Sequence, residues 1–407
     1  MPSERLEKVL AEEVAALRER GTAKGDEHVV RAVIPAEGNR GPRYLLEGAA
    51  ERSFLRMSSN SYLGLSLRSE LMRAEEEATR AFGVGPGAVR FISGTYTPHV
   101  AVERRLAEFH GREAGMIFSS AYATTLGVMV PLITAETAVI SDALNHNCII
   151  NAMRLARPKT KSVYAHLDVG ELEAQLEAAA EGGAERAIVV TDGVFSMRGD
   201  HAPLHEIVEA VRGHDERFAH NALLIVDDSH GVGAFGDTGR GTEEVTGANA
   251  DLLVATLGKA LGVNGGYVVG PRAVIDSLRE TAPLYIYSNP ITCGEAAAAL
   301  AALEILDGEE GRALLRHLRT LTRRFEQGLV DLGFETIPGE HPVVPLMVRD
   351  TARTAALVRH LEANGVLATG LNYPVVPRGD EEIRFQVNAD HTEADIDEVL
   401  DVLRRFG

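Results

Sequence analysis

Short apolar runs that alternate with helical patterns constrain the fold of this chain more than any other feature. Between about residues 56 and 290 the runs have the length of strands, and segments with helical spacing alternate with them. Strands that alternate with helices in this way build a mostly parallel sheet covered by helices on both faces. The clearest strands are Ala187–Val190, Ala222–Val226, Leu252–Ala255 and Tyr267–Val269. We therefore predict a large α/β domain over residues 56–290, built on a mostly parallel sheet.

The regions on either side predict a helical arm and a smaller domain. Residues 1–55 are expected to form one helix, over residues 4–20 and ended by Gly21, and then short strands. Residues 291–407 combine helical patterns with short strands near 343–348 and 383–387, which predicts a small α+β domain. The first helix must pack on the body of the protein or on a second subunit, because it carries an apolar stripe made of Leu6, Val9, Leu10, Val14 and Leu17.

The charge balance excludes whole classes of partner. The chain has 41 Lys and Arg residues against 59 Asp and Glu residues, and a net charge of −18 argues against general binding to nucleic acids or anionic membranes. The first 20 residues are charged throughout and lack the apolar core of a signal peptide. Cys148 and Cys293 lie far apart and match no zinc motif, so we interpret both as buried free thiols. We expect a cytoplasmic protein without a membrane span.

Polar side chains crowd the carboxyl ends of three consecutive predicted strands. Open α/β sheets bind their ligands at this edge, and one polar strand end alone would mean little. Three in a row predict one site. In chain order the residues are Thr191, Asp192 and Ser196, then Asp227, Asp228, Ser229 and His230, and then Thr256 and Lys259.

Lys259, in T-L-G-K-A-L-G, is the candidate nucleophile. Lysine forms Schiff bases with carbonyl groups, and burial lowers its pKa enough to make the amine reactive. A solvated surface lysine is the competing interpretation, and for this residue alone it is the better one. The Gly-Lys pair is not a phosphate-binding loop, because Ala260 follows where Ser or Thr is required.

Asp227 and His230, in D-D-S-H, fit a pyridoxal phosphate (PLP) site beside that lysine. PLP needs a carboxylate against its pyridinium nitrogen, and a nearby histidine can hydrogen-bond the phenolic oxygen of the ring. Metal binding and a purely structural aspartate are the alternatives. Closed metal sites draw on more His or Cys than this segment offers, so no metal is expected.

A glycine-rich segment directly downstream supports a remote alternative, an NAD-binding oxidoreductase. Residues 231–236 read G-V-G-A-F-G after a strand, and Asp251 follows about 20 residues on. Four polar residues separate the strand from the glycines, however, and the continuation D-T-G-R-G-T has the composition of a loop where a helix should begin. We interpret the segment as a flexible turn that carries Arg240.

Weaker candidates lie elsewhere in the chain. His146 precedes a helical pattern, and in isolation it is an ordinary loop histidine. Ala121 and Tyr122 open another apolar helix, whose first amides suit a phosphate, with a simple helix cap as the alternative. Asn60 lies in S-S-N-S-Y-L-G-L. Arg384 could hold a carboxylate through two parallel hydrogen bonds, although surface ion pairing is the default for arginine.

Several ordered motifs between about Ser58 and His391 resemble the α-oxoamine synthases, PLP enzymes of the aspartate aminotransferase fold (fold type I). They are S-S-N-S-Y-L-G-L, V-R-F-I-S-G-T, S-D-A-L-N-H, T-D-G-V-F-S-M-R-G-D, V-D-D-S-H-G-V-G, T-L-G-K-A-L-G and Y-P-V-V-P. The resemblance implies that the mostly parallel sheet of the large domain has seven strands. Within the family the segments are more similar to the glycine C-acetyltransferase (2-amino-3-ketobutyrate CoA ligase) branch than to 8-amino-7-oxononanoate synthase.

The resemblance implies a role for each matching residue. Lys259 would form the internal aldimine and move the substrate's α-proton, with His146 stacked on the cofactor ring. Asp227 would face the pyridinium nitrogen and His230 the phenolic oxygen. Asn60 and Arg384 would hold the amino-acid carboxylate. The remaining cofactor contacts implied are Ala121, Tyr122, Ser196 and Thr256, together with Ser288 and Asn289, which in a homodimer would reach the partner subunit's phosphate.

The implied reaction joins an amino acid, glycine first, to an acyl-CoA, acetyl-CoA first, through a quinonoid carbanion, and yields an α-amino-β-keto acid. This chain departs from the acetyltransferase pattern near the substrate, at Tyr96, Pro98, Pro290, Asn388 and Asp390. A related synthase that uses another amino acid or acyl thioester, on CoA or on a carrier protein and with or without decarboxylation, is therefore the alternative.

Overall fold

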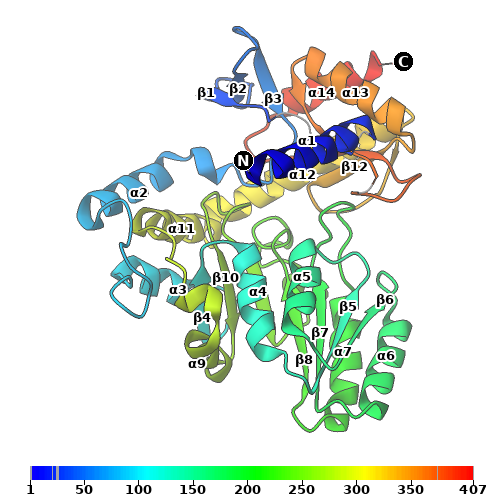
Figure 1. The fold of residues 1–407 in the computed structure, drawn as a ribbon. Coiled ribbons are helices and arrows are strands. Elements are labelled where there is room, and N and C mark those ends of the chain that lie inside the picture. Colours follow the sequence, from blue (N-terminus) through cyan, green and yellow to red (C-terminus); the bar gives the residue numbers. More distant parts are fainter. Residues whose placement is uncertain (1, 21, 24–26, 374, 407) are drawn as a thin grey trace. The chain divides into compact units, whose positions relative to one another are not determined.

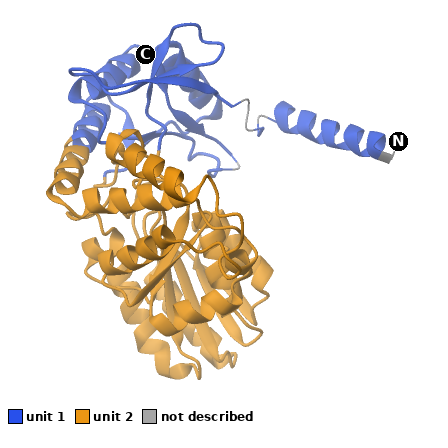
Figure 2. Cartoon of the chain, turned by 90° about the vertical axis from the view of Figure 1, so that its left-hand side faces the viewer, with its two compact units in different colours: residues 1–59, 321–338, 343–407 blue, residues 60–320, 339–342 orange. Residues whose placement is uncertain are grey.

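The computed structural model describes residues 2–20, 22–23, 27–373 and 375–406. The chain divides into two compact units (Figure 2). Unit 1 holds residues 1–59, 321–338 and 343–407, and unit 2 holds residues 60–320 and 339–342. The division falls inside one long helix, α12 (Glu309–Asp331).

Unit 2 is built on a seven-stranded sheet with the order β4-β10-β9-β8-β7-β5-β6 (Figure 1). Strand β10 runs antiparallel to both of its neighbours, and the other neighbouring pairs are parallel, so the predicted mostly parallel sheet is confirmed. The strands are β4 (Ala114–Phe118), β5 (Thr137–Asp142), β6 (Thr160–Tyr164), β7 (Arg186–Asp192), β8 (Ala222–Asp227), β9 (Leu252–Thr256) and β10 (Gly266–Gly270).

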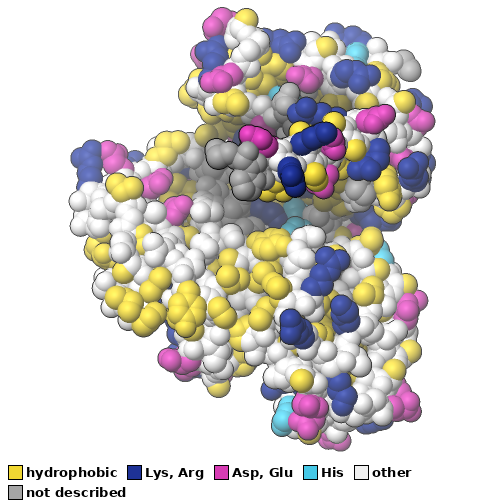
Figure 3. Space-filling model, in the orientation of Figure 1, with side chains coloured by type: hydrophobic (Ala, Val, Ile, Leu, Met, Phe, Trp, Pro, Cys, Tyr) yellow, Lys and Arg dark blue, Asp and Glu magenta, His cyan; other side chains and the backbone are white. Residues whose placement is uncertain are grey.

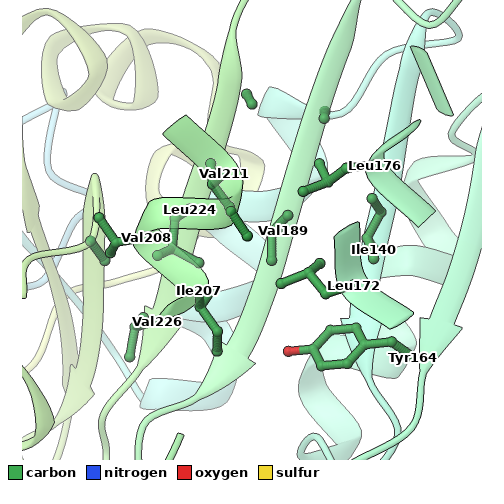
Figure 4. Packing of buried hydrophobic residues seen from close by; sticks show 14 of the residues in the cluster. Ile140, Tyr164, Leu172, Leu176, Val189, Ile207, Val208, Val211, Leu224 and Val226 are labelled. Carbon is green, nitrogen blue, oxygen red and sulfur yellow. The ribbon is translucent and has the colours of Figure 1, made fainter. Parts of the chain in front are cut away.

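Helices cover both faces of this sheet. Alternate residues of each strand point to opposite sides, so each strand contributes side chains to both cores. Val189 packs with the face that α6 and α7 cover, whereas its neighbour Ile188 packs with the face that α4, α5 and α9 cover. Figure 4 shows the first of these two cores, where Leu172 and Ile207 meet the strands. The helices of unit 2 are η1 (Leu65–Leu67), α2 (Ser69–Phe82), α3 (Thr97–Phe109), α4 (Ala121–Leu132), α5 (Asn147–Ala156), α6 (Val169–Glu181), α7 (Leu204–His214), η2 (Asp215–Arg217), α8 (Thr242–Thr246), α9 (Arg272–Thr281), α10 (Pro283–Ile286) and α11 (Cys293–Leu306).

Unit 1 contains two four-stranded sheets, with the orders β1-β2-β3-β13 and β11-β12-β15-β14. Its helices are α1 (Pro2–Glu19), α13 (Thr351–Ala363) and α14 (Glu393–Arg404), together with the second half of α12. The strands are β1 (Val30–Ile34), β2 (Arg43–Leu46), β3 (Ser53–Arg56), β11 (Glu335–Thr336), β12 (Val343–Met347), β13 (Val366–Leu367), β14 (Thr369–Leu371) and β15 (Glu382–Gln386).

The division differs from the predicted boundaries at residues 55 and 290. The N-terminal segment belongs with the C-terminal one, because β3 pairs in parallel with β13, Leu55 opposite Val366. Residues 291–320 belong to unit 2, since α11 packs against α2 and α3. At Gly294 a Cβ atom would lie 2.7 Å from the Thr79 hydroxyl, so α11 and α2 approach closely.

The predicted N-terminal helix is present as α1, and its apolar stripe is exposed. Leu6 is 58 % exposed and Val9 is 49 % exposed, so the stripe does not pack on the described part of this chain. Gly21, the predicted end of the helix, lies outside the described residues. No helix in the described ranges is long and apolar enough to cross a membrane.

Candidate active site

A pocket in unit 2 lies where the carboxyl ends of β7 and β8 meet the first residues of α4 and α5. Asp192 ends β7, Asp227 ends β8, and Lys259 follows β9 by three residues. The three polar strand ends thus meet at one place, as the sequence predicts. The pocket is lined by Ala121, Tyr122, His146, Cys148, Asp192, Val194, Ser196, Asp227, Ser229, His230 and Lys259.

Asp227 is surrounded by hydrogen-bond donors. Its Oδ1 accepts from the backbone N–H of Ser229 at 3.2 Å and from the Ser229 hydroxyl at 2.5 Å. Its Oδ2 accepts from the Thr125 hydroxyl at 3.2 Å and, at 3.8 Å, from the Cys148 thiol. Four donors stabilise a charged carboxylate in a buried position, which is what a cationic ring nitrogen requires.

His146 is the N-cap of α5, and this position fixes its tautomer. Its Nδ1 accepts from the backbone N–H of Cys148 at 3.3 Å, so the neutral ring carries its proton on Nε2. Burial lowers the pKa of His146, and the nearby Lys259 charge adds to this while Asp227 opposes it. The pocket is therefore lined by a neutral imidazole that can donate a hydrogen bond.

His230 contacts a buried tyrosine, Tyr62, that no sequence motif marks as a site residue. The Tyr62 hydroxyl lies 2.7 Å from His230 Nδ1, and the Tyr62 side chain is fully buried. The same hydroxyl donates to Asn60 Oδ1 at 3.4 Å, which places the predicted carboxylate ligand beside this pair. A buried tyrosine hydroxyl needs a partner, but 168 residues separate Tyr62 from His230, so only the fold reveals which one.

The Lys259 turn is fixed by a glycine. Gly262 has φ +74°, and a Cβ atom there would lie 2.5 Å from the backbone nitrogen of Ser66. The Gly262 N–H donates to the Lys259 carbonyl at 3.0 Å. Thr256, a predicted cofactor contact, accepts from the Gly258 N–H at 3.0 Å at the start of the same turn.

The N-terminus of α4 forms the opposite wall of the pocket. Ser120 is its N-cap and accepts from the Ala123 N–H at 3.1 Å, whereas the amides of Ala121 and Tyr122 belong to the first turn, which has no intrahelical acceptors. Strand β10 approaches this turn so closely that a Cβ atom at Gly266 would lie 2.4 Å from the Ala121 nitrogen. Backbone N–H groups at a helix N-terminus suit a phosphate.

Known proteins match nearly the whole chain. A family model for aminotransferase class I and II matches residues 52–403. An 8-amino-7-oxononanoate synthase from Symbiobacterium thermophilum is 39% identical over 400 residues, which cover 98% of this chain and 97% of that protein. The mitochondrial 2-amino-3-ketobutyrate coenzyme A ligase of Bos taurus is 36% identical over 402 residues, 98% of this chain and 91% of that protein. Among solved structures, a serine palmitoyltransferase from S. paucimobilis with a bound PLP–myriocin aldimine is 26% identical, with a TM-score of 0.87 over 97% of this chain and 96% of that one.

The chain belongs to the aminotransferase class I and II family. Its relatives place it among the α-oxoamine synthases, which confirms the predicted family, fold type and PLP cofactor. The predicted preference for the glycine C-acetyltransferase branch is not decided, because relatives named for the two reactions match at similar identity. No cluster of potential metal ligands occurs in the part of the chain that the structure describes.

Five of the predicted α-oxoamine synthase residues are not among those that line the pocket: Asn60, Thr256, Ser288, Asn289 and Arg384. Ser288 and Asn289 follow α10, and Asn289 is exposed. Arg384 lies on β15 in unit 1. The roles of these residues remain predictions. The motif Y-P-V-V-P includes Pro374, which lies outside the described residues.

The glycine-rich segment 231–236 forms buried turns around an aspartate and does not open a helix. The Asp228 carboxylate accepts from the Thr242 N–H and the Thr242 hydroxyl, each at 2.7 Å. A Cβ atom at Gly231 would lie 2.1 Å from this carboxylate. Burial raises the pKa of Asp228 to about 6, although the Thr242 hydrogen bonds oppose it. Arg240 is held by Phe109 and Asp307, so the turn predicted to be flexible is tied down, and the dinucleotide alternative loses its support.

Asp192 is a pocket residue to which the sequence analysis gave no role. Its Oδ2 accepts from the His146 backbone N–H at 3.2 Å, and its own N–H donates to Asn145 Oδ1 at 2.8 Å. These bonds join the end of β7 to the turn that presents His146. Burial, and then the charge of Asp227, hold the pKa of Asp192 well above its usual range.

A second polar cluster supports the loop that carries Ser196. His166 lies between two carboxylates, with Nδ1 at 3.0 Å from Asp142 Oδ1 and Nε2 at 3.2 Å from Asp200 Oδ2. Its ring also meets the edge of Phe195 at a centroid distance of 4.4 Å. This bridge ties the end of β5 to the loop after β7.

Proposed function

We propose that this chain is an acyltransferase that joins the α-carbon of an amino acid to the acyl group of a thioester. The observation that carries the proposal is that Lys259, Asp227, His230 and His146 line one pocket at the strand ends of an α-oxoamine synthase fold. An amine and a buried carboxylate are the groups that PLP chemistry on an amino acid requires, and two imidazoles line the same pocket.

The residues of the pocket fit PLP by their chemistry. When bound, PLP acts as an electron sink that acidifies the α-carbon of the amino acid. Lys259 would hold the aldehyde carbon of the cofactor through its amine and, once the amine of the amino acid has displaced it, would be free to take the α-proton. Asp227 holds a proton on the ring nitrogen, and the first amides of α4 bind the phosphate.

The two imidazoles have different tasks in this proposal. His230 is oriented through its Nδ1 by Tyr62, which leaves Nε2 for the phenolic oxygen of the ring. His146 is neutral and carries its proton on Nε2, so it donates a hydrogen bond to the carbonyl oxygen of the acyl group and polarises it. Asn60 and Arg384 are the proposed ligands of the amino-acid carboxylate.

For the substrates, we propose glycine and acetyl-CoA. The alternative is another amino acid or acyl thioester, as the names of the 8-amino-7-oxononanoate synthase and serine palmitoyltransferase relatives suggest for those proteins. Neither glycine nor the acetyl group carries a large apolar chain, so the alternative differs from this proposal in the amino-acid side chain or in the length of acyl chain accepted. We propose that the reaction takes place in the cytoplasm.

We further propose a homodimer with shared active sites, to which Ser288 and Asn289 contribute across the interface. Exposed apolar side chains that lie together support this, since a monomer rarely exposes a large contiguous apolar patch unless a partner covers it. Hydrophobic side chains gather in Figure 3 over the part of unit 2 that holds α3 and α4. The most exposed ones near α3 and α10 are Val84 at 80 %, Tyr287 at 78 %, and Phe91 and Ile92 at 65 % each.

The test is a substrate matrix with mass detection. The purified holoenzyme is incubated with glycine, alanine or serine and with acetyl, pimeloyl or palmitoyl thioesters, and the products are identified by mass. We expect 2-amino-3-oxobutanoate from glycine and acetyl-CoA, and no product with Lys259→Ala. A product from another pair would replace the substrates and leave the reaction class standing. No acyl transfer from any pair would overturn the proposal.

A further inference from the structure

Two buried carboxyl groups lie side by side at the bottom of the pocket. Asp192 and Asp227 are direct Cα partners on the parallel strands β7 and β8, and neighbouring strands are about 4.8 Å apart. Both residues line the pocket, and their exposed fractions are 4 % and 7 %. At such a separation and burial, two negative charges are strongly unfavourable.

The surroundings of the two carboxyl groups are unequal. Asp227 accepts from the amide and hydroxyl of Ser229, from the hydroxyl of Thr125 and from the thiol of Cys148. Asp192 accepts on Oδ2 only from the His146 backbone, and its buried Oδ1 has no hydrogen-bond partner within the described ranges. A buried oxygen without a donor disfavours the charged form of its carboxyl group, so the negative charge belongs on Asp227.

We propose that Asp192 and Asp227 hold one proton between them, and that Asp192 carries it. In this form Asp192 is a positioning residue. Its Oδ2 accepts from the His146 backbone and so fixes the His146 turn, while the buried Oδ1 carries the proton. The inference deepens the proposed function and rests on it for its purpose, because it concerns the charge that the cofactor ring and Lys259 meet.

The charged groups around Asp192 agree with this assignment. The charges of Asp227 on β8 and Asp142 on β5 favour the un-ionised form, whereas the Lys259 charge and the hydrogen bond from the His146 backbone oppose it. Two groups near Asp192, the Cys148 thiol and the Tyr164 phenol, stay neutral because burial raises their pKa values. Burial and the Asp227 charge together hold the pKa of Asp192 well above its usual range.

The single charge has a chemical consequence for Lys259. A second carboxylate in the pocket would stabilise the ammonium form of the lysine, and only the neutral amine is a nucleophile. With one proton on the pair, the pocket offers one fixed negative charge to the ring nitrogen. Asp192 thereby keeps the His146 turn in place without adding that second charge.

The direct test is an infrared difference spectrum on the apoprotein in D2O at neutral pH. We expect wild type minus Asp192→Asn to show the carbonyl stretch of an un-ionised carboxyl group, whereas wild type minus Asp227→Asn shows a carboxylate band. Other buried acids, such as Asp228 and Glu243, are common to both proteins and cancel. Should Asp192→Asn fail to fold, Asp192→Ser, which keeps a hydroxyl donor, serves instead. An un-ionised band that is absent from wild type, or that survives in the variant, would overturn the proposal.

Unfolding against pH gives a second readout that a merely structural role would not move. Because the folded state retains a proton that the unfolded state releases above about pH 4, wild type loses stability relative to Asp192→Asn as pH rises from about 4 to 7. The urea midpoint of Asp192→Asn should therefore rise relative to that of wild type between about pH 4 and pH 7. A constant difference would count against the pair. Cofactor binding distinguishes a failure of this inference from a failure of the proposed function. If the un-ionised band is present but PLP does not bind, the shared proton stands and the proposed function is rejected. If PLP binds but the band is missing, the shared proton is rejected and the proposed function stands.

Discussion

The bridge between His166 and its two carboxylates predicts a stability that depends on pH. Burial by itself lowers the pKa of His166, but the hydrogen bonds to Asp142 and Asp200 outweigh it and raise that pKa to about 9, from an ordinary value of 6.5. This rise of the pKa from 6.5 to about 9 corresponds to about 3 kcal/mol of stabilisation of the folded state, because each pH unit is worth roughly 1.4 kcal/mol. Because the His166 side chain is only 19 % exposed, solvent weakens these interactions only slightly.

The sign follows from proton linkage. The folded state binds the His166 proton more tightly than the unfolded state, so the full contribution is present below about pH 6.5 and is lost as pH rises through about 9. His166→Gln removes the charge and retains a polar side chain. We expect it to cost about 3 kcal/mol of unfolding free energy at pH 6 and clearly less at pH 10.

The assay is urea unfolding of both apoproteins between pH 6 and pH 10, followed by circular dichroism. His205→Gln, on the exposed face of α7, is the matched control and should show no comparable change with pH. Groups that titrate elsewhere are shared by wild type and variant, so they cancel in the difference. If the cost of His166→Gln were the same at pH 6 and pH 10, the charged bridge would be refuted.

Three further substitutions test other parts of the account. Gly266→Ala should weaken PLP binding at least tenfold in a cofactor titration, because its Cβ would lie 2.4 Å from the Ala121 nitrogen; unchanged affinity would reject this helix end as the phosphate site. Arg43→Met should lower the unfolding free energy by about 3–5 kcal/mol, since it strands the buried Asp395 carboxylate now 2.6 Å away, and a loss below 1 kcal/mol would contradict this. Leu176→Ala should cost about 2–5 kcal/mol through the cavity left between α6 and the sheet, with unchanged PLP affinity as the check that the site is intact.

The strands of unit 2 were predictable because their signal is local. An apolar run such as Ala222–Val226 must be buried on both faces, and the polar residues after it mark where the strand ends; β8 ends at Asp227. The same reasoning brought Lys259, Asp227 and His230 to one edge of the sheet. The sequence therefore sufficed to bring these residues to one pocket, and their roles remain predictions.

What the sequence could not predict depends on pairings between distant residues. Tyr62 became a site residue only when the fold placed its hydroxyl 2.7 Å from His230. Asp192 was visible as a polar strand end, but its place opposite Asp227 comes from the register of β7 and β8. The boundaries of the units were missed for the same reason, since the pairing of Leu55 with Val366 has no local trace.

The most direct test of the central claim is to locate the cofactor on the chain. The chain contains five lysines, so borohydride reduction of the holoenzyme, followed by peptide mass mapping, identifies the attachment site unambiguously. We predict a reduced PLP adduct on Lys259 and on none of the other four lysines, and its loss in Lys259→Ala. An adduct on another lysine, or none on wild type, would contradict the assignment of this pocket as the active site.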